Sequence, residues 1–242
     1  MITKSVVKDI QSLADKKYRD HTGLFVSEGP KLVQELLRDC PQAIKHIYAV
    51  ESWIHQHRNI DSSIQVTAVT PQELERISQL TSSHEVLAVV SKFTVRPLQV
   101  EQGLTLVCCG IQDPGNFGTI LRTADWFGVQ QLVCSPDTVD VYNPKVVQAT
   151  MGSIARLQIH YLDLKPWILH QQVPIYAAML NGKSVYELKR PQQGILLIGN
   201  EAKGVPESLL TKNVIGVTIP KIGEAESLNA AVATGILLSW LS

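Results

Sequence analysis

The fold is decided by three stretches in the last quarter of the sequence, Gly199-Asn200-Glu201-Ala202-Lys203-Gly204, Ile219-Pro220-Lys221-Ile222-Gly223 and Ser227-Leu228-Asn229-Ala230-Ala231-Val232-Ala233. Each of the first two follows an apolar run, 194–198 and 214–219, of the kind that forms a buried parallel strand. The third begins a predicted helix. Glycine and proline in the turns let the backbone pass close to a ligand. The pattern therefore predicts that two strand ends and one helix start converge on one small site.

The alternation of apolar strands and helices extends back to residue 104. Further strands are predicted at 104–111, 131–134, 157–161 and 175–178, and helices at 119–127 and from Asn143, Asp163 and Pro206. A turn, 112–118, joins the first of these strands to helix 119–127. This alternation favours an α/β domain whose mainly parallel sheet is covered by helices on both faces.

The front half is predicted to form a smaller α/β unit. Residues 4–19 have helical periodicity and carry five basic residues, Lys4, Lys8, Lys16, Lys17 and Arg19, which form either an ordinary solvated face or a patch that contacts phosphates. Strands and helices then alternate over residues 24–90, as in a three-layer unit. Pro97 and Gly103 bracket a polar linker. We therefore predict a domain over 1–97, a linker over 98–103 and a second domain over 104–242.

Composition narrows the class of protein. The sequence contains 22 basic residues (Lys and Arg) and 22 acidic residues (Asp and Glu). Because these charges balance, any contact with a polyanion must come from local basic patches. The charged N-terminus lacks the apolar run of a signal peptide, and no run reaches the roughly 18 apolar residues of a membrane helix. The four cysteines lack metal-ligand spacing, so we expect buried, reduced thiols and no metal. These features predict a soluble cytoplasmic protein without a membrane partner.

Two nucleotide-binding motifs are incomplete. Asn181-Gly182-Lys183-Ser184 resembles the end of a P-loop, but Ala177 stands where that motif requires its first glycine. Gly115-Asn116-Phe117-Gly118 lacks the full glycine spacing of a dinucleotide-binding turn. Neither a P-loop enzyme nor a dinucleotide-binding enzyme is favoured.

A constellation of polar and turn-forming residues remains at strand ends and helix starts, where α/β sheets bind ligands: Asn116, Gly118, Arg122, Glu201, Ser227 and Asn229. Taken singly, Asn116 could be a turn former, Ser227 a helix N-cap and Glu201 a surface charge. At about 100° per residue, Arg122 lies roughly 200° from Ile120, so it faces away from the packed side of helix 119–127. An arginine in that position is placed to reach a partner.

These residues resemble the three signature motifs of the SpoU family of RNA 2′-O-ribose methyltransferases, in the SPOUT superfamily. The resemblance rests on Asn116-x-Gly118-x-x-x-Arg122, on Gly199-Asn200-Glu201-x-x-Gly204 and on Ile219-Pro220-x-x-Gly223-x-x-x-Ser227-Leu228-Asn229, and it covers residues 104–242. Asn143-Pro144-Lys145 and Met151-Gly152-Ser153 are similar as well. The front half, with Phe25-Val26-Ser27-Glu28-Gly29, resembles the ribosomal-protein-like substrate-binding domain that is often fused to this family.

The resemblance implies a trefoil-knotted domain that binds S-adenosylmethionine, with Gly199, Ile219 and Leu228 lining the pocket, and that works as a homodimer. It also implies that Arg122, Asn116, Glu201, Ser227 and Asn229 serve methyl transfer to RNA, ribosomal rather than transfer RNA being favoured. Lys16, Lys17 and Arg19 become the candidate RNA contacts. Lys221 and Ala230-Ala231 depart from the family pattern, which affects details of the donor pocket.

Two alternatives from other classes stay open. The first is an RNA-binding protein on the same scaffold that has lost catalysis, which would bind the donor without transferring methyl groups. The second is an unrelated α/β nucleotide-binding enzyme, which a nicotinamide or ATP ligand would stabilise selectively.

Overall fold

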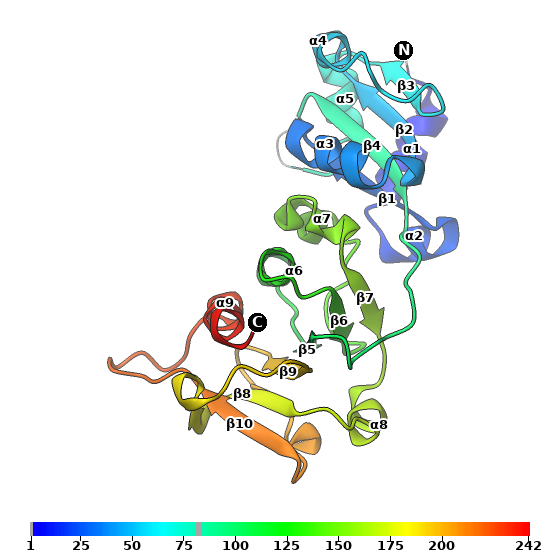
Figure 1. Cartoon of the computed structure of the whole chain (residues 1–242). Coiled ribbons are helices and arrows are strands. Elements are labelled where there is room, and N and C mark those ends of the chain that lie inside the picture. The colour runs from blue at the N-terminus through cyan, green and yellow to red at the C-terminus, as the bar shows by residue number, and fades with distance from the viewer. Residues whose placement is uncertain (1, 81–83) are drawn as a thin grey trace. The chain divides into compact units, whose positions relative to one another are not determined.

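A computed structural model describes residues 2–80 and 84–242 of the chain (Figure 1). Contacts between Cα atoms divide the chain into two compact units. The first runs to Thr94 and includes Asp140–Ala155, and the second comprises Val95–Val139 and Arg156–Ser242. Among the described residues, no helix combines the length and the apolar content needed to cross a membrane.

The second unit is built on a six-stranded sheet in which every neighbouring pair is parallel. The strand order is β10-β8-β9-β5-β6-β7. The bounds are Leu104–Cys109 for β5, Gln131–Cys134 for β6, Gln158–Tyr161 for β7, Ile175–Ser184 for β8, Gly194–Gly199 for β9 and Val214–Thr218 for β10. The predicted α/β class with a mainly parallel sheet is confirmed; the trefoil knot stays a prediction.

Strand β8 is longer than predicted, and this settles the P-loop question. Beyond Ala177 the register shifts, so that Lys183 pairs with Val217 and Ser184 with Thr218 of β10. Residues 181–184 therefore form part of a strand and not a phosphate-binding loop.

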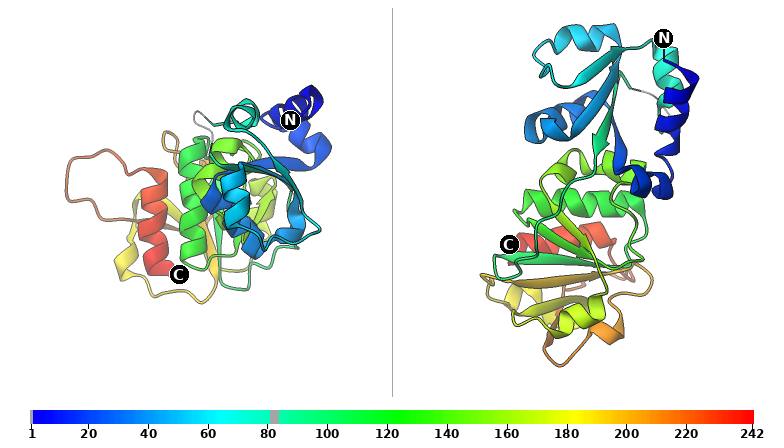
Figure 2. Two further views of the ribbon diagram at one scale, coloured as in Figure 1. Left: turned by 90° about the horizontal axis from the view of Figure 1, so that it is seen from above. Right: turned by 90° about the vertical axis from the view of Figure 1, so that its right-hand side faces the viewer.

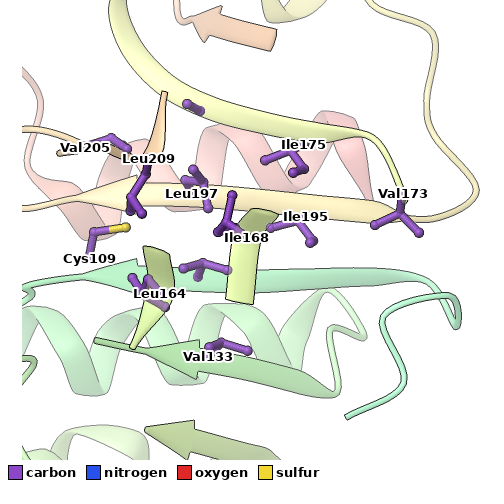
Figure 3. Packing of buried hydrophobic residues seen from close by; sticks show 12 residues of the cluster. Cys109, Val133, Leu164, Ile168, Val173, Ile175, Ile195, Leu197, Val205 and Leu209 are labelled. Atoms are coloured by element: carbon purple, nitrogen blue, oxygen red, sulfur yellow. The ribbon is translucent and has the colours of Figure 1, made fainter. Parts of the chain in front are cut away.

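Helices cover both faces of this sheet. Leu164 and Ile168 of α8 (Leu164–Leu169) pack with Ile195 and Leu197 of β9 in one buried cluster (Figure 3). The long helices α6 (Pro114–Trp126) and α9 (Ala230–Leu241) pack against each other and lie side by side in both views of Figure 2. Two short 3-10 turns, η3 (Val185–Glu187) and η4 (Glu207–Leu209), follow β8 and β9.

Two predicted helix starts are wrong because side chains cap the helices elsewhere. Helix α6 begins at Pro114, inside the predicted turn 112–118, because the Asp113 carboxylate accepts a hydrogen bond from the backbone N–H of Asn116 (2.7 Å). Helix α9 begins at Ala230 and not at Ser227, because Asn229 is its N-cap. Asn116 consequently lies in the first turn of a helix.

The first unit contains a four-stranded mixed sheet in the order β1-β4-β2-β3. Strand β4 is antiparallel to β1 and β2, and β2 is parallel to β3. The bounds are Leu24–Glu28 for β1, Ile44–Ala49 for β2, Gln65–Ala68 for β3, Val86–Ser91 for β4, Lys4–Ser12 for α1, Lys16–Thr22 for α2, Pro30–Asp39 for α3, Pro41–Ala43 for η1, Glu51–Gln56 for α4 and Pro71–Ile77 for α5. The predicted single helix 4–19 is wrong, because the Asp15 carboxylate caps a new helix at Lys16.

Residues 140–155 pack with the first unit although they follow β6 in the chain. They contain α7 (Pro144–Thr150) and the turn η2 (Ser153–Ala155). The ring of Tyr142 lies 4.8 Å from that of Phe25, and a Cβ added to Gly152 would stand 2.6 Å from the Cβ of Glu35. The predicted division at 98–103 places residues 140–155 in the second domain, whereas the contacts place them in the first unit. The predicted domain bounds stay a prediction about functional domains.

Arg19 is buried, which corrects its place among the candidate RNA contacts. Its side chain is 2% exposed, and Nη2 donates to Asp140 Oδ2 at 2.6 Å. Nη1 donates to the carbonyl oxygens of Leu13 and Ala14 at 2.8 and 2.7 Å. This guanidinium therefore ties the α1–α2 turn to residue 140, and RNA cannot reach it in this structure.

Replacing Arg19 should destabilise the protein strongly. In Arg19→Met the carboxylate of Asp140 loses its partner, and we expect the free energy of unfolding to fall by about 3–5 kcal/mol. Urea denaturation followed by tryptophan fluorescence measures it. Lys17→Met, on the exposed side of α2, is the matched control and should stay within about 0.5 kcal/mol of wild type. Equal stability of the two variants would contradict the structural role assigned to Arg19.

Candidate active site

The three motifs meet at the carboxyl edge of the parallel sheet. Strands β5 and β9 are neighbours, and Cys109 pairs with Gly199 at their last residues, so the segments that follow them leave the sheet side by side. Strand β10 lies farther along, with β8 between it and β9. The third motif reaches the site only because residues 219–229 lead from β10 to α9, which packs on α6.

A chain of side-chain hydrogen bonds links one residue from each motif. The amide Nδ2 of Asn229 donates to Asn116 Oδ1 at 2.9 Å, and Asn116 Nδ2 donates to Glu201 Oε1 at 2.7 Å. The carboxamide of Asn116 thus uses one donor and one acceptor to join the other two. The structure therefore brings together three of the five residues predicted to serve catalysis.

Helix ends fix the orientation of the two asparagines. Asn116 is held in the first turn of α6 by the Asp113 cap, and Asn229 Oδ1 accepts from the backbone N–H groups of Ala231 (2.9 Å) and Val232 (3.3 Å). Asn229 therefore caps α9 and orients Asn116 at once. The packing of α9 on α6 sets the distance between them.

Asn200 is a site residue to which sequence reasoning gave no role. Its Nδ2 donates to the carbonyl oxygen of Gly110 just beyond β5 (2.9 Å), and its Oδ1 accepts from the backbone N–H of Ala202 (2.9 Å). It thereby holds the turn that carries Glu201. Its position between a strand and a glycine turn was the available signal, because asparagine commonly closes such turns through its side chain.

Gly199 is required by the same turn. A Cβ at this position would overlap the carbonyl carbon of Gly204, because residues 200–204 fold back over the strand end. Any side chain would therefore displace the second motif. The role in donor binding that the resemblance implies for Gly199 stays a prediction.

The loop formed by residues 219–229 has the character of a binding surface. Within the described chain, no hydrogen bond joins the backbone of residues 220–228 to another residue. Ile222 is fully exposed and Leu228 is 46% exposed, whereas Ile219 is half-buried. Apolar side chains beside unused backbone donors and acceptors fit a methyl donor recognised largely through backbone groups, so Ile219 and Leu228 remain candidates for its pocket.

Arg122 and Ser227 do not belong to the hydrogen-bonded chain. Both are exposed, and neither side chain bonds to another of the described residues. Arg122 follows Asn116 by about 9 Å along the axis of α6, at 1.5 Å per residue. Its exposure agrees with the predicted outward direction.

The cysteines and the other side chains that could bind a metal ion bear on whether the site uses thiol or metal chemistry. All four cysteines are free and buried, as predicted, and burial raises the pKa of the Cys109 thiol at the end of β5. It stays protonated at neutral pH and is a poor nucleophile. No group of three or more His, Cys, Asp or Glu side chains in residues 2–80 and 84–242 could hold a metal ion.

The remaining basic candidates for RNA contact lie on the surface of the first unit. Lys4, Lys8, Lys16 and Lys17 are exposed. Lys16 forms an ion pair with Asp20 at 2.7 Å, while Lys17 carries no ion pair with another described residue. Lys16 and Lys17 therefore stay candidates, in contrast to Arg19.

Both halves of the chain match known families. Residues 103–239 match the SpoU rRNA Methylase family, and residues 4–88 match the MRM3-like substrate binding domain. The two matches leave residues 89–102 between them, a span that contains most of the predicted linker.

Relatives and solved structures of RNA methyltransferases are similar to this chain over nearly its whole length. It is 31% identical to the 23S rRNA (guanosine(2553)-2′-O)-methyltransferase RlmP of Bacillus subtilis over 97% of this chain and 95% of that protein. A structure from Porphyromonas gingivalis, assigned to the TrmH family of RNA methyltransferases, is 36% identical with a TM-score of 0.88, covering 100% of this chain and 98% of that one. An AdoMet-bound rRNA methyltransferase from Sinorhizobium meliloti is 30% identical with a TM-score of 0.83 over 98% and 94%.

The bond between Asn116 and Glu201 should be measurable as an energetic coupling. The variants Asn116→Ala and Glu201→Ala, alone and together, should show a coupling of about 1 kcal/mol in the free energy of unfolding, because the bond is charge-assisted but partly exposed. Glu101→Ala, before the amino end of β5, is the control for Glu201 and should combine additively with Asn116→Ala. Additivity in both pairs would show that the bond contributes nothing in solution.

Proposed function

The chain belongs to the SpoU rRNA methylase family, and from this we infer that it transfers a methyl group from S-adenosylmethionine to a ribose 2′-hydroxyl of ribosomal RNA. The observation that carries the proposal is the hydrogen-bonded chain from Asn229 through Asn116 to Glu201, which unites all three motifs at one edge of the sheet. The match of residues 4–88 to a substrate-binding domain supports an RNA substrate.

The protein has to align the RNA and ease the loss of one proton. When bound, S-adenosylmethionine supplies a methyl group already activated by its sulfonium charge. Residues 220–228, with Gly199, Ile219 and Leu228, would hold it. The 2′-oxygen would form its bond to the methyl carbon as the methyl–sulfur bond breaks, with S-adenosylhomocysteine as the leaving group, and the hydroxyl proton would be released to water. Groups that orient this oxygen and stabilise its developing charge accelerate such a reaction.

Arg122 is the candidate for that stabilisation. Arginine side chains offer hydrogen-bond donors and no acceptor, so this residue is not suited to act as a simple general base. It is exposed on α6 and can hold the phosphate beside the reacting ribose while donating to the 2′-oxygen. Ser227, exposed on the loop before α9, would bind the ribose.

The other motif residues position these groups. The carboxamide of Asn229 is hydrogen-bonded to the first turn of α9 and to Asn116, so its role would be to orient Asn116. Glu201 accepts from Asn116 through Oε1, and Oε2 accepts no hydrogen bond from a described side chain. That second oxygen is available to the RNA.

A homodimer in the cytoplasm is part of the proposal. Helix α9 leaves Val232 and Trp240 exposed by 52% and 40%, and Ile222 is fully exposed in the loop before it. A second copy would cover this apolar surface. The RNA substrate and the reduced thiols accord with the cytoplasm.

Transfer of labelled methyl groups tests the function. Total RNA from a strain lacking this protein should be methylated by the purified enzyme, and nucleoside mapping should find one 2′-O-methylated position in ribosomal RNA. Donor binding without transfer to RNA or to ribosomal particles would favour the RNA-binding protein that lacks catalysis. Absence of donor binding would contradict the proposal itself.

The role of Arg122 predicts a specific loss. Arg122→Ala should lower kcat/KM about 10²–10³-fold with unchanged donor affinity, as for removal of one donor from a developing oxyanion. Arg122→Lys keeps the charge but not the planar fork and should lose at least about tenfold. Arg190→Ala, another exposed arginine of the same unit, is the control. Near-normal turnover of Arg122→Ala would exclude a catalytic role, and near-normal turnover of Arg122→Lys would exclude bidentate geometry.

A further inference from the structure

The first unit contains a hollow that the reaction does not explain. Its volume is about 460 Å³, and it lies between the second half of α3, the end of α4 and residues 57–64. An adjoining hollow of about 370 Å³ shares five lining residues with it: His57, Arg58, Ile60, Asp61 and Ile64. The size matches that of small-ligand sites, and none of the motif residues lines it.

His57 presents a fixed aromatic plane in this hollow. Its Nδ1 lies 2.8 Å from the carbonyl oxygen of Trp53, and its Nε2 lies 2.6 Å from Nε2 of Gln34. These two contacts hold the ring at both nitrogens and so fix its orientation. The buried indole of Trp53 stacks on the ring at 4.1 Å, with 16° between the planes. A ligand ring can stack only on the face of His57 that Trp53 leaves uncovered.

The rest of the lining combines an apolar floor with an amide-rich rim. Leu37 and Ile60 supply apolar surface, whereas Gln34 and Asn59 supply donors and acceptors. Arg58 and Asp61 are exposed beside them, and Asp61 Oδ1 accepts a hydrogen bond from the backbone N–H of Ser63. Flat aromatic surface, carboxamides and one arginine are the groups that proteins use for unstacked bases, base edges and phosphates.

We propose that this hollow binds one unpaired nucleotide of the RNA substrate. The base stacks on His57, its edge is read by the carboxamides of Gln34 and Asn59, and Arg58 holds the adjoining phosphate. The inference rests on the proposed function and on the match of residues 4–88 to a substrate-binding domain.

The test compares His57→Ala, His57→Phe and Arg58→Ala with Arg76→Ala in the full-length protein. Arg76 is an exposed arginine on α5 of the same unit and does not line the hollow. Affinity for 23S ribosomal RNA transcribed in vitro is measured over a series of salt concentrations, with kcat and KM for methyl transfer beside it. Circular dichroism and donor affinity confirm that each variant is folded.

His57→Ala should weaken RNA binding about tenfold with an unchanged salt slope, because base stacking on a ring does not neutralise a phosphate. His57→Phe should stay within about threefold of wild type. Arg58→Ala should weaken binding and reduce the salt slope by about one. KM should rise with little change in kcat, and Arg76→Ala should resemble wild type.

Wild-type affinity of His57→Ala for an RNA that the wild type methylates would overturn the proposal and leave the hollow to a protein partner. Equal losses in folded His57→Ala and His57→Phe would overturn the stacking. If the wild type methylated no RNA at all, the proposed function would be contradicted instead. Failure of the nucleotide-binding proposal and failure of the proposed function are therefore distinguishable.

Discussion

The site depends on the parallel pairing of β5 with β9. Because Cys109 and Gly199 are level in this register, the first and second motifs leave the sheet at the same edge and at the spacing of neighbouring strands. Asn116 and Glu201 can then meet through one hydrogen bond of 2.7 Å. A shift of one residue would turn the buried side chains of β9 to the opposite face, so the hydrophobic core also sets the geometry of the polar site.

Much of this arrangement could be predicted from the sequence, for an identifiable reason. The apolar runs that form β5 and β9 are buried, whereas β10, predicted as a buried strand as well, lies at the edge of the sheet with Ile215 41% exposed. Glycine or proline follows each of the three runs, so both the strands and the edge at which they end are visible in the sequence. The candidates Asn116, Glu201 and Asn229 followed from their places beside those ends. Which of them bond to one another could not be predicted, because the return of residues 219–229 across the sheet is a tertiary feature.

Arg19 shows where residue patterns fail. Helical periodicity identifies the apolar face but not which of several basic side chains finds a buried carboxylate, and Asp140 is 121 residues away in the chain. The helix starts failed for a related reason. Asp113, Asp15 and Asn229 begin helices through one or two hydrogen bonds each, which outweigh the weak preferences of the residues around them.

The placement of residues 140–155 has a consequence for how the protein can be dissected. The backbone passes from one compact unit to the other three times, after Thr94, Val139 and Ala155. A fragment cut at the linker would carry α7 without the strand it packs on, exposing Val146 and Val147, which are otherwise fully buried. Exchange of the front unit between relatives therefore succeeds only if this helix is exchanged with it, so recombination has to respect two segments rather than one boundary.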